Sequence, residues 1–138
     1  MPATASGIFL GFDPGRDKCG LALVSGDRHP LRHEVVPAEH AIATLQDWLQ
    51  AEPPQCLVMG DGTTTKQWQI ELEQAFPNLA IALVDERNST LEARDRYWQL
   101  YPPQGLQRLV PLGMRVPPRP VDDIVAILLV ERYLQASS

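Results

Sequence analysis

The sequence predicts an α/β fold in which a mixed five-stranded sheet is flanked by helices, and three observations lead to this prediction. Two short apolar runs, at 7–12 and 20–25, are separated by a cluster of turn residues, which is typical of a β-hairpin. Further apolar runs alternate with segments in which apolar residues recur at helical spacing. Prolines and glycines separate these segments. Strands joined by short turns pair antiparallel, whereas strands joined through helices run parallel with right-handed crossovers.

Periodicity and turn residues place the remaining elements. Amphipathic spacing indicates helices, fully apolar runs indicate buried strands, and prolines mark element ends. Ser89-Thr90-Leu91-Glu92 fits a capping box at the start of the third helix. Residues 102–120 are rich in proline and are expected to form a long loop. The other expected elements are a strand at 31–36, a helix at 38–50, a strand at 56–60, a helix at 64–76, a strand at 79–84, a helix at 89–101 and a buried helix at 121–134.

Composition sets limits on the class of protein. The 138 residues favour a single domain over 1–138, and 44% hydrophobic residues can form a core. The net charge of −5 shows no overall basic footprint for nucleic acid, although a local patch can still bind it. Cys19 and Cys56 are expected to be buried free thiols in a reducing compartment. Because the start, "MPATASG", lacks the features of a signal peptide and no run is long enough to span a membrane, we expect a soluble cytoplasmic protein.

Acidic residues stand at the ends of three predicted strands and at the start of the last helix. If strands one, four and five are parallel neighbours, their carboxyl ends meet at one edge of the sheet, where ligands bind in open α/β sheets. The last helix is expected beside the first strand, which would bring its acids to the same edge. The acids concerned are Asp13 after strand one, Asp61 after strand four, Asp85 and Glu86 after strand five, and Asp122 and Asp123 at the helix start.

Most of these acids also have a simpler explanation. Asp61 can serve as a helix N-cap, and Asp122 or Asp123 can lie in a first helical turn because the helix dipole favours acids there. Asp13 precedes no helix, so this explanation does not cover it. Clustered carboxylates repel one another, and a divalent cation usually offsets the repulsion. Oxygen ligands suit Mg²⁺ or Mn²⁺, and two such ions can hold the attacking and leaving oxygens of a phosphodiester.

A basic segment precedes the last helix. Residues 96–121 contain four arginines and no acid: Arg96, Arg108, Arg115 and Arg119. Arginines bind phosphates, and the nearby Tyr97, Trp98 and Tyr101 either stack on bases or belong to the core, the latter being favoured for Trp98. Arg87, next to Glu86, can pair with a carboxylate or touch a phosphate. No zinc pattern accompanies the three histidines, which are expected at the surface: His29, His33 and His40.

Three stretches carry a resemblance to a known family: "LGFDPGRDKCGLALV", "VDERNSTLEAR" and "VDDIVAILLVERYL". In this order they resemble the YqgF/RuvX family of RNase H-like nucleases, whose members are described as Holliday junction resolvases or as nucleases that process pre-16S rRNA. The resemblance implies an RNase H-like fold, a metal-dependent nuclease that acts at the 5′ end of pre-16S rRNA, and Mg²⁺ or Mn²⁺ bound by Asp13, Glu86 and Asp122. Asp61, Asp85 and Arg87 are expected to support them, and Arg108, Arg115 and Arg119 to bind nucleic acid.

The sequence departs from the family pattern at two places. Pro14 and Lys18-Cys19 replace the residues usual after the first Asp, and Gly60-Asp61-Gly62-Thr63 replaces Gly-Leu-Pro after strand four. The second departure places Asp61 where RuvC-type resolvases have their second carboxylate. A Holliday junction resolvase-like DNA endonuclease is therefore an alternative. Two further alternatives are a nucleotide-binding protein of the actin-like ATPase type, with "GDGTTTK" at a phosphate, and a non-catalytic protein that binds nucleic acid or regulates a partner.

Overall fold

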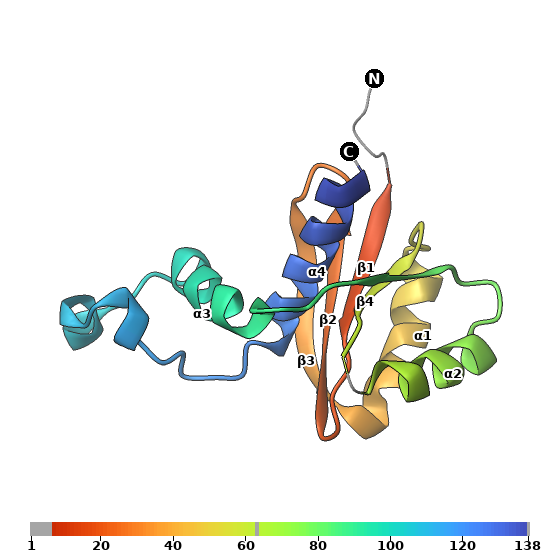
Figure 1. Ribbon diagram of the computed structural model, residues 1–138, viewed down its shortest axis with the longest axis horizontal. Helices are drawn as coiled ribbons and strands as arrows, with labels where there is room; N and C mark the ends of the chain where they lie inside the picture. Colours follow the sequence, from red (N-terminus) through yellow and green to blue (C-terminus); the bar gives the residue numbers. More distant parts are fainter. Residues whose placement is uncertain (1–6, 63, 138) are drawn as a thin grey trace.

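The computed structural model describes residues 7–62 and 64–137, in which five strands form one sheet with helices on both faces (Figure 1). Part of the expected "GDGTTTK" loop, Thr63, and most of the "MPATASG" start lie outside the described residues. The elements in chain order are β1 Ile8–Asp13, β2 Lys18–Ser25, β3 Pro30–Pro37, the 3-10 helix η1 Ala38–His40, α1 Ala41–Ala51, β4 Leu57–Gly60, α2 Thr65–Ala75, β5 Ile81–Val84, α3 Ser89–Leu100, the 3-10 helices η2 Gly105–Leu109 and η3 Leu112–Met114, and α4 Asp122–Ser137.

The sheet has the predicted topology. Its strand order is β3-β2-β1-β4-β5, with β1, β2 and β3 antiparallel and β1, β4 and β5 parallel. The short turn after Asp13 allows only antiparallel return, whereas α1 and α2 provide the crossovers that parallel strands need. The carboxyl ends of β1, β4 and β5 therefore share one edge of the sheet, as expected.

Alternation along the strands creates two apolar layers. On β1, Phe9 faces the layer formed with α3 and α4, whereas Leu10 and Phe12 face the layer formed with α1 and α2. Helix α4 lies across the sheet on the first of these faces, and α1 and α2 cover the other (Figure 1). Residues 123–130 of α4 are buried, which confirms the expectation that the last helix is a core helix.

Two glycines allow α4 to approach the sheet closely. A Cβ atom on Gly11 of β1 would overlap the carbonyl oxygen of Ala126, and one on Gly20 of β2 would overlap the carbonyl oxygen of Asp122. The helix backbone thus rests directly on the strands, because neither position carries a side chain. This contact fixes the height of the α4 N-terminus above the end of β1.

One local prediction, the capping box at Ser89–Glu92, was wrong. Ser89 is the first residue of α3 rather than its N-cap; the N-cap is Asn88, whose left-handed backbone (φ 60°) makes no side-chain cap. The predicted capping box is absent because the Glu92 carboxylate pairs instead with Arg132 of α4, at 2.9 Å. The predicted loop at 102–120 contains η2 and η3, and with α3 it projects from the sheet (Figure 1).

Several expectations about single side chains can be checked directly. Cys19 and Cys56 are free and buried, as predicted, and Trp98 is a core residue. Tyr97 is also buried, whereas Tyr101 is exposed. His33 was expected at the surface but is half-buried and bonds to Asp123. No helix among the described residues has the length and apolar character needed to cross a membrane.

Candidate active site

Asp13 and Asp122 meet where α4 begins above the sheet. Side chains alternate along β1, so Asp13 is on the same face as Phe9 and Gly11, toward α4. Its partner in the adjacent strand is Gly20, and the Asp122 backbone occupies the space above Gly20. The missing side chain at Gly20 is therefore what lets the first residue of α4 come down beside Asp13.

Glu86 reaches the same face from the turn between β5 and α3. Its carboxylate lies over Gly60 and Gly62, where a Cβ atom on either glycine would overlap a carboxylate oxygen. The Glu86 amide donates a long hydrogen bond of 3.4 Å to Oδ1 of Asp61, the acid that follows β4. Glycine at the end of β4 thus provides the space that the Glu86 side chain fills.

Asp13 and Glu86 line one cleft of about 340 Å³, but Asp122 is not part of its wall. Hydroxyl groups make the cleft polar, and Thr65 is fixed there because its Oγ1 donates to the carbonyl oxygen of Gly60. The other lining residues are Pro14, Gly15, Gly62, Thr64, Thr65, Ser89 and Thr90.

The three acids have shifted proton affinities. Burial, followed by the charges of Asp122 and Glu86, raises the pKa of Asp13 from 3.8 to about 7. Burial, followed by the charges of Asp61 and Asp85, raises the pKa of Glu86. Burial also raises the pKa of Asp122, against the opposing charge of Lys18. A cation bound among these carboxylates would offset the repulsion between them, which contributes to their raised pKa values.

Asp122 has an unused ligand atom, whereas Asp123 is fully engaged. Oδ2 of Asp122 is buried and has no hydrogen-bond partner among the described residues. Asp123 is 2% exposed and accepts hydrogen bonds from His33 Nδ1 at 2.6 Å and Arg119 at 3.0 Å. These bonds outweigh burial and lower the pKa of Asp123. Asp123 therefore anchors the helix start, while Asp122 retains a free oxygen.

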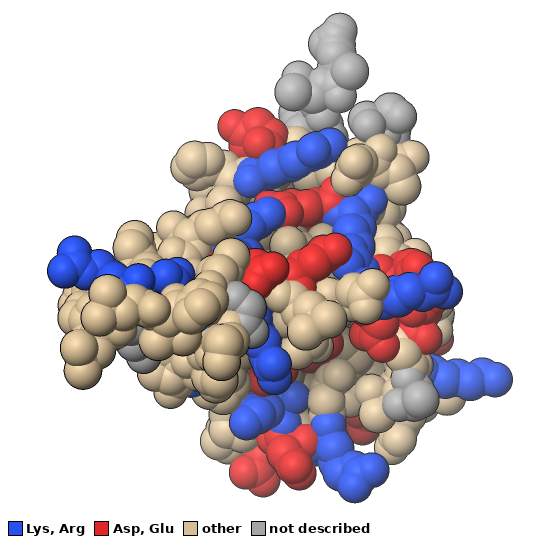
Figure 2. Space-filling view, turned by 60° about the vertical axis from the view of Figure 1, so that its left-hand side comes forward, with Lys and Arg blue, Asp and Glu red and all other residues tan. Residues whose placement is uncertain are grey.

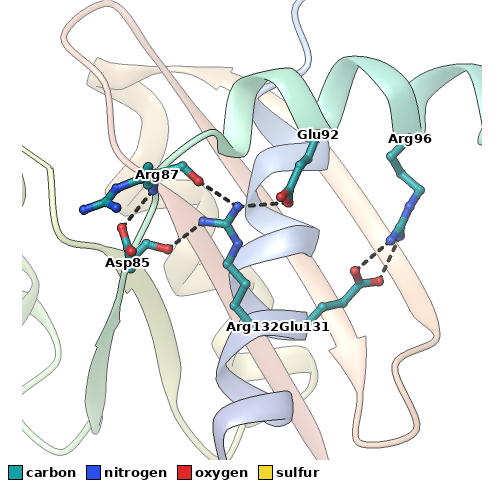
Figure 3. A network of polar contacts seen from close by, with 6 residues as sticks. All are labelled: Asp85, Arg87, Glu92, Arg96, Glu131 and Arg132. Atoms are coloured by element: carbon teal, nitrogen blue, oxygen red, sulfur yellow. Dashed lines mark hydrogen bonds and ion pairs between the residues drawn. The ribbon is translucent and has the colours of Figure 1, made fainter.

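The three predicted supporting residues surround Glu86 in different ways. Asp61 contacts the Glu86 amide, and Asp85 Oδ1 accepts the backbone N–H of Arg87 at 2.9 Å. The Arg87 guanidinium is exposed and points away from the network around Arg132 (Figure 3). Asp61 and Asp85 thus shape the turn that carries Glu86.

The predicted nucleic-acid arginines differ in their surroundings. Arg108 is exposed on η2, and Arg115 is half-buried, with its Nε donating to the Val110 carbonyl at 2.8 Å. Arg119 is bound to Asp123 and lies over the rings of Tyr97 and Tyr101. Figure 2 shows acidic and basic side chains interspersed on the face to which the projecting segment contributes.

Sequence reasoning missed the glycines that make room for the acids and the residues that hold the turns. Gly20, Gly60 and Gly62 are visible in the sequence, but a glycine in a strand gives no indication of what lies above it. Lys18 is exposed at the start of β2, and its charge acts on Asp122, which the sequence did not indicate. Arg132, which binds the turn around Glu86, had no signal other than its place on the last helix.

The structure brings possible metal ligands to one face of the sheet, but it does not arrange them as a complete metal site. Within residues 7–62 and 64–137, no three His, Cys, Asp or Glu side chains are already arranged to enclose an ion. Asp13, Glu86 and Asp122 nevertheless supply carboxylate oxygens on one face of the sheet, and one of these oxygens, Oδ2 of Asp122, is buried with no hydrogen-bond partner among the described residues. Such oxygens fit a hard divalent cation.

Comparisons with known proteins agree with this architecture. No protein-family model matches the chain. Proteins of Legionella pneumophila strains Lens and Philadelphia 1, each named "Putative pre-16S rRNA nuclease", are 29% identical to it over 148 residues, which cover 95% of this chain and 97% of theirs. The structure of Thermus thermophilus RuvC superposes with a TM-score of 0.54 at 14% identity, covering 94% of this chain and 92% of RuvC. The chain is therefore similar along nearly its whole length to proteins named as pre-16S rRNA nucleases, and it shares the RNase H-like fold of RuvC.

Proposed function

We propose that this chain is a metal-dependent endonuclease that hydrolyses phosphodiester bonds in structured nucleic acid, and that it processes the 5′ end of pre-16S rRNA in the cytoplasm. The name of the Legionella relatives supports this substrate. The main support for the proposal is that Asp13, Glu86 and Asp122, which are far apart in the sequence, lie on one face of the sheet.

We propose that Asp13, Glu86 and Asp122 hold Mg²⁺ or Mn²⁺. When bound, the ion would supply an activated water and would stabilise the charge on the leaving oxygen. Two observations support this assignment. Oδ2 of Asp122 has no partner among the described residues and could bind a cation, and a cation would also offset the repulsion of Asp13 by Asp122 and Glu86. Asp61 and Asp85 act through the turn that carries Glu86.

The rest of the cleft provides for substrate. Thr64 and Thr90 line it and offer hydroxyl donors to non-bridging phosphate oxygens. We propose that Arg108 and Arg115 contact the backbone of the nucleic acid beyond the cleft. Arg119, by contrast, is paired with Asp123, and we propose that it acts by tying the segment before α4 to the helix start.

One assay tests the proposal. Purified protein with Mg²⁺ or Mn²⁺ is incubated with fragments spanning the 5′ end of pre-16S rRNA, and the expected result is cleavage that Asp13→Asn, Glu86→Gln and Asp122→Asn each abolish. Asp17→Asn is the control, since this exposed carboxylate lies in the turn between β1 and β2 and outside the cleft wall. Undiminished cleavage by Asp13→Asn would overturn the mechanism, and RNA binding without cleavage under every metal condition would favour a non-catalytic role.

A DNA substrate is the second candidate. Asp61 follows β4 and contacts the Glu86 amide, so a fourth acid stands at the same sheet edge, as the sequence comparison with RuvC-type resolvases anticipates. A four-way DNA junction tested beside the RNA fragment separates the two substrates. Metal-dependent cleavage of the junction alone would assign the chain to DNA.

A further inference from the structure

Arg132 joins the last helix to the turn that carries Glu86. From α4, its Nη1 donates to the carbonyl oxygen of Asp85 at 2.7 Å, and its Nη2 donates to the carbonyl oxygen of Arg87 at 2.8 Å (Figure 3). These two carbonyls belong to the residues immediately before and after Glu86. One guanidinium therefore holds the backbone on both sides of a candidate metal ligand.

The remaining backbone groups of the turn are also bonded. The Glu86 amide donates to Asp61 Oδ1, and the Glu86 carbonyl accepts the amide of Ser89 at 3.0 Å. With the two flanking carbonyls held as well, the peptide planes around Glu86 are constrained. Their orientation determines where the Glu86 Cα–Cβ bond points, and in this arrangement it directs the carboxylate over Gly60 and Gly62.

The guanidinium itself is oriented by its surroundings. Its Nη2 also pairs with Glu92 of α3 at 2.9 Å, and the preceding residue of α4, Glu131, makes a two-bond ion pair with Arg96 of α3. Only a planar guanidinium offers donors in a fork that can reach two carbonyls and a carboxylate together; an ammonium group cannot match this geometry.

We propose that Arg132 is a positioning residue, which holds the Asp85–Arg87 turn so that Glu86 presents its carboxylate to a divalent cation in the cleft. This inference rests on the proposed function, because it takes Glu86 to be a metal ligand. It concerns a residue that does not line the cleft, and it assigns to Arg132 an effect on metal affinity that an ion pair between helices does not have.

The test compares Arg132→Ala and Arg132→Lys with two matched controls. Arg96→Gln breaks the neighbouring α3–α4 ion pair without touching the turn, and Glu92→Gln removes the acidic partner of Arg132 while leaving both carbonyl bonds. Calorimetric titration with Mn²⁺ in the absence of nucleic acid measures affinity, and hydrogen exchange measures protection of the Arg87 and Ser89 amides.

Both Arg132 variants should bind Mn²⁺ about 10-fold more weakly or worse, the range for loss of an outer-shell partner of a metal ligand. Amide exchange at Arg87 and Ser89 should accelerate in them, while Arg96→Gln and Glu92→Gln retain wild-type affinity. Arg132 variants that bind Mn²⁺ as Arg96→Gln does, at matched unfolding temperature, would overturn the proposal.

The outcome is separable from that of the nuclease proposal. If the wild-type protein binds Mn²⁺ but cuts neither RNA nor DNA, the nuclease activity is wrong and the affinity comparison still decides the role of Arg132. If the wild-type protein binds no Mn²⁺, Glu86 is not a metal ligand and the proposal is overturned, whatever the exchange rates show about the turn.

Discussion

Asp13 has a proton affinity in the folded protein that differs strongly from its ordinary value. Its pKa is raised from 3.8 to about 7, first by burial and then by Asp122 and Glu86. Between these values the folded state binds a proton that the unfolded state has released. In the metal-free protein, the free energy of unfolding should therefore fall as pH rises through this window, by up to about 1.4 kcal/mol per pH unit.

Asp13→Asn should remove most of this pH dependence. Because asparagine carries no charge to be desolvated or repelled, the variant should unfold at a higher temperature than the wild type at pH 8, and at a similar temperature near pH 4. Thermal unfolding in chelator-treated buffer across this range measures the difference. Asp17→Asn serves as the control, and a variant curve parallel to that of the wild type would show that Asp13 is ionised throughout.

At the residue scale, the acidic residues could be identified from sequence motifs, but their bonding partners could not. Asp13 could be singled out because it ends an apolar strand and precedes no helix. The capping box failed because Glu92 has a tertiary partner, Arg132, that lies forty residues away and leaves no local trace. His33 was placed at the surface for the same reason, since its partner Asp123 belongs to the last helix. Local patterns predict short-range bonds, and here long-range pairs replaced them.

At the element scale, α4 is fitted to the sheet through glycine. Gly20→Ala would place a methyl group against the Asp122 carbonyl, so the helix start must move or the strand must distort. Such overpacking costs about 1–3 kcal/mol of the free energy of unfolding. Because the displaced residue is a proposed ligand, Mn²⁺ affinity should fall as well.

Gly11→Ala provides the comparison for this prediction. It overlaps the Ala126 carbonyl one helical turn further along α4, so it should reduce stability by a similar amount. Its effect on Mn²⁺ binding should be smaller, because Ala126 is not a proposed ligand and lies one helical turn beyond Asp122. Chemical denaturation gives the two stabilities and calorimetry the two affinities; equal loss of affinity in both variants would mean that stability alone governs the site.

The order and type of the elements could be predicted because each rests on a strong local pattern. The buried strands are apolar runs, and α1 and α2 have helical spacing between proline-marked ends. The 3-10 helices at Gly105–Leu109 and Leu112–Met114 could not be predicted, because such short turns have no apolar period and depend on contacts such as that of Arg115 with Val110.

At the scale of the whole molecule, topology brings acids from distant parts of the sequence to one face of the sheet. The strand order places β1 between β2 and β4, so Asp13 has Gly20 on one side and the end of β4 on the other. This order could be inferred from connection lengths, which is why the sheet edge was predicted correctly. How closely the acids approach could not be inferred, because it depends on the height of α4 and on the turn held by Arg132.

The distribution of charge gives the last prediction. The chain has a net charge of −5, yet the projecting segment that follows α3 carries arginines and no acid. Arg108 is exposed there, so Arg108→Gln should weaken RNA binding while leaving the unfolding temperature unchanged. If Arg108 neutralises one phosphate, the slope of log affinity against log salt should fall by about 1.

Arg28→Gln is the control, because Arg28 is exposed in the β2–β3 turn, at the opposite end of β2 from the cleft. Fluorescence anisotropy with a labelled RNA, measured at several salt concentrations in Ca²⁺ to prevent cleavage, distinguishes the two variants; equal slopes would show that the segment does not contact the RNA backbone.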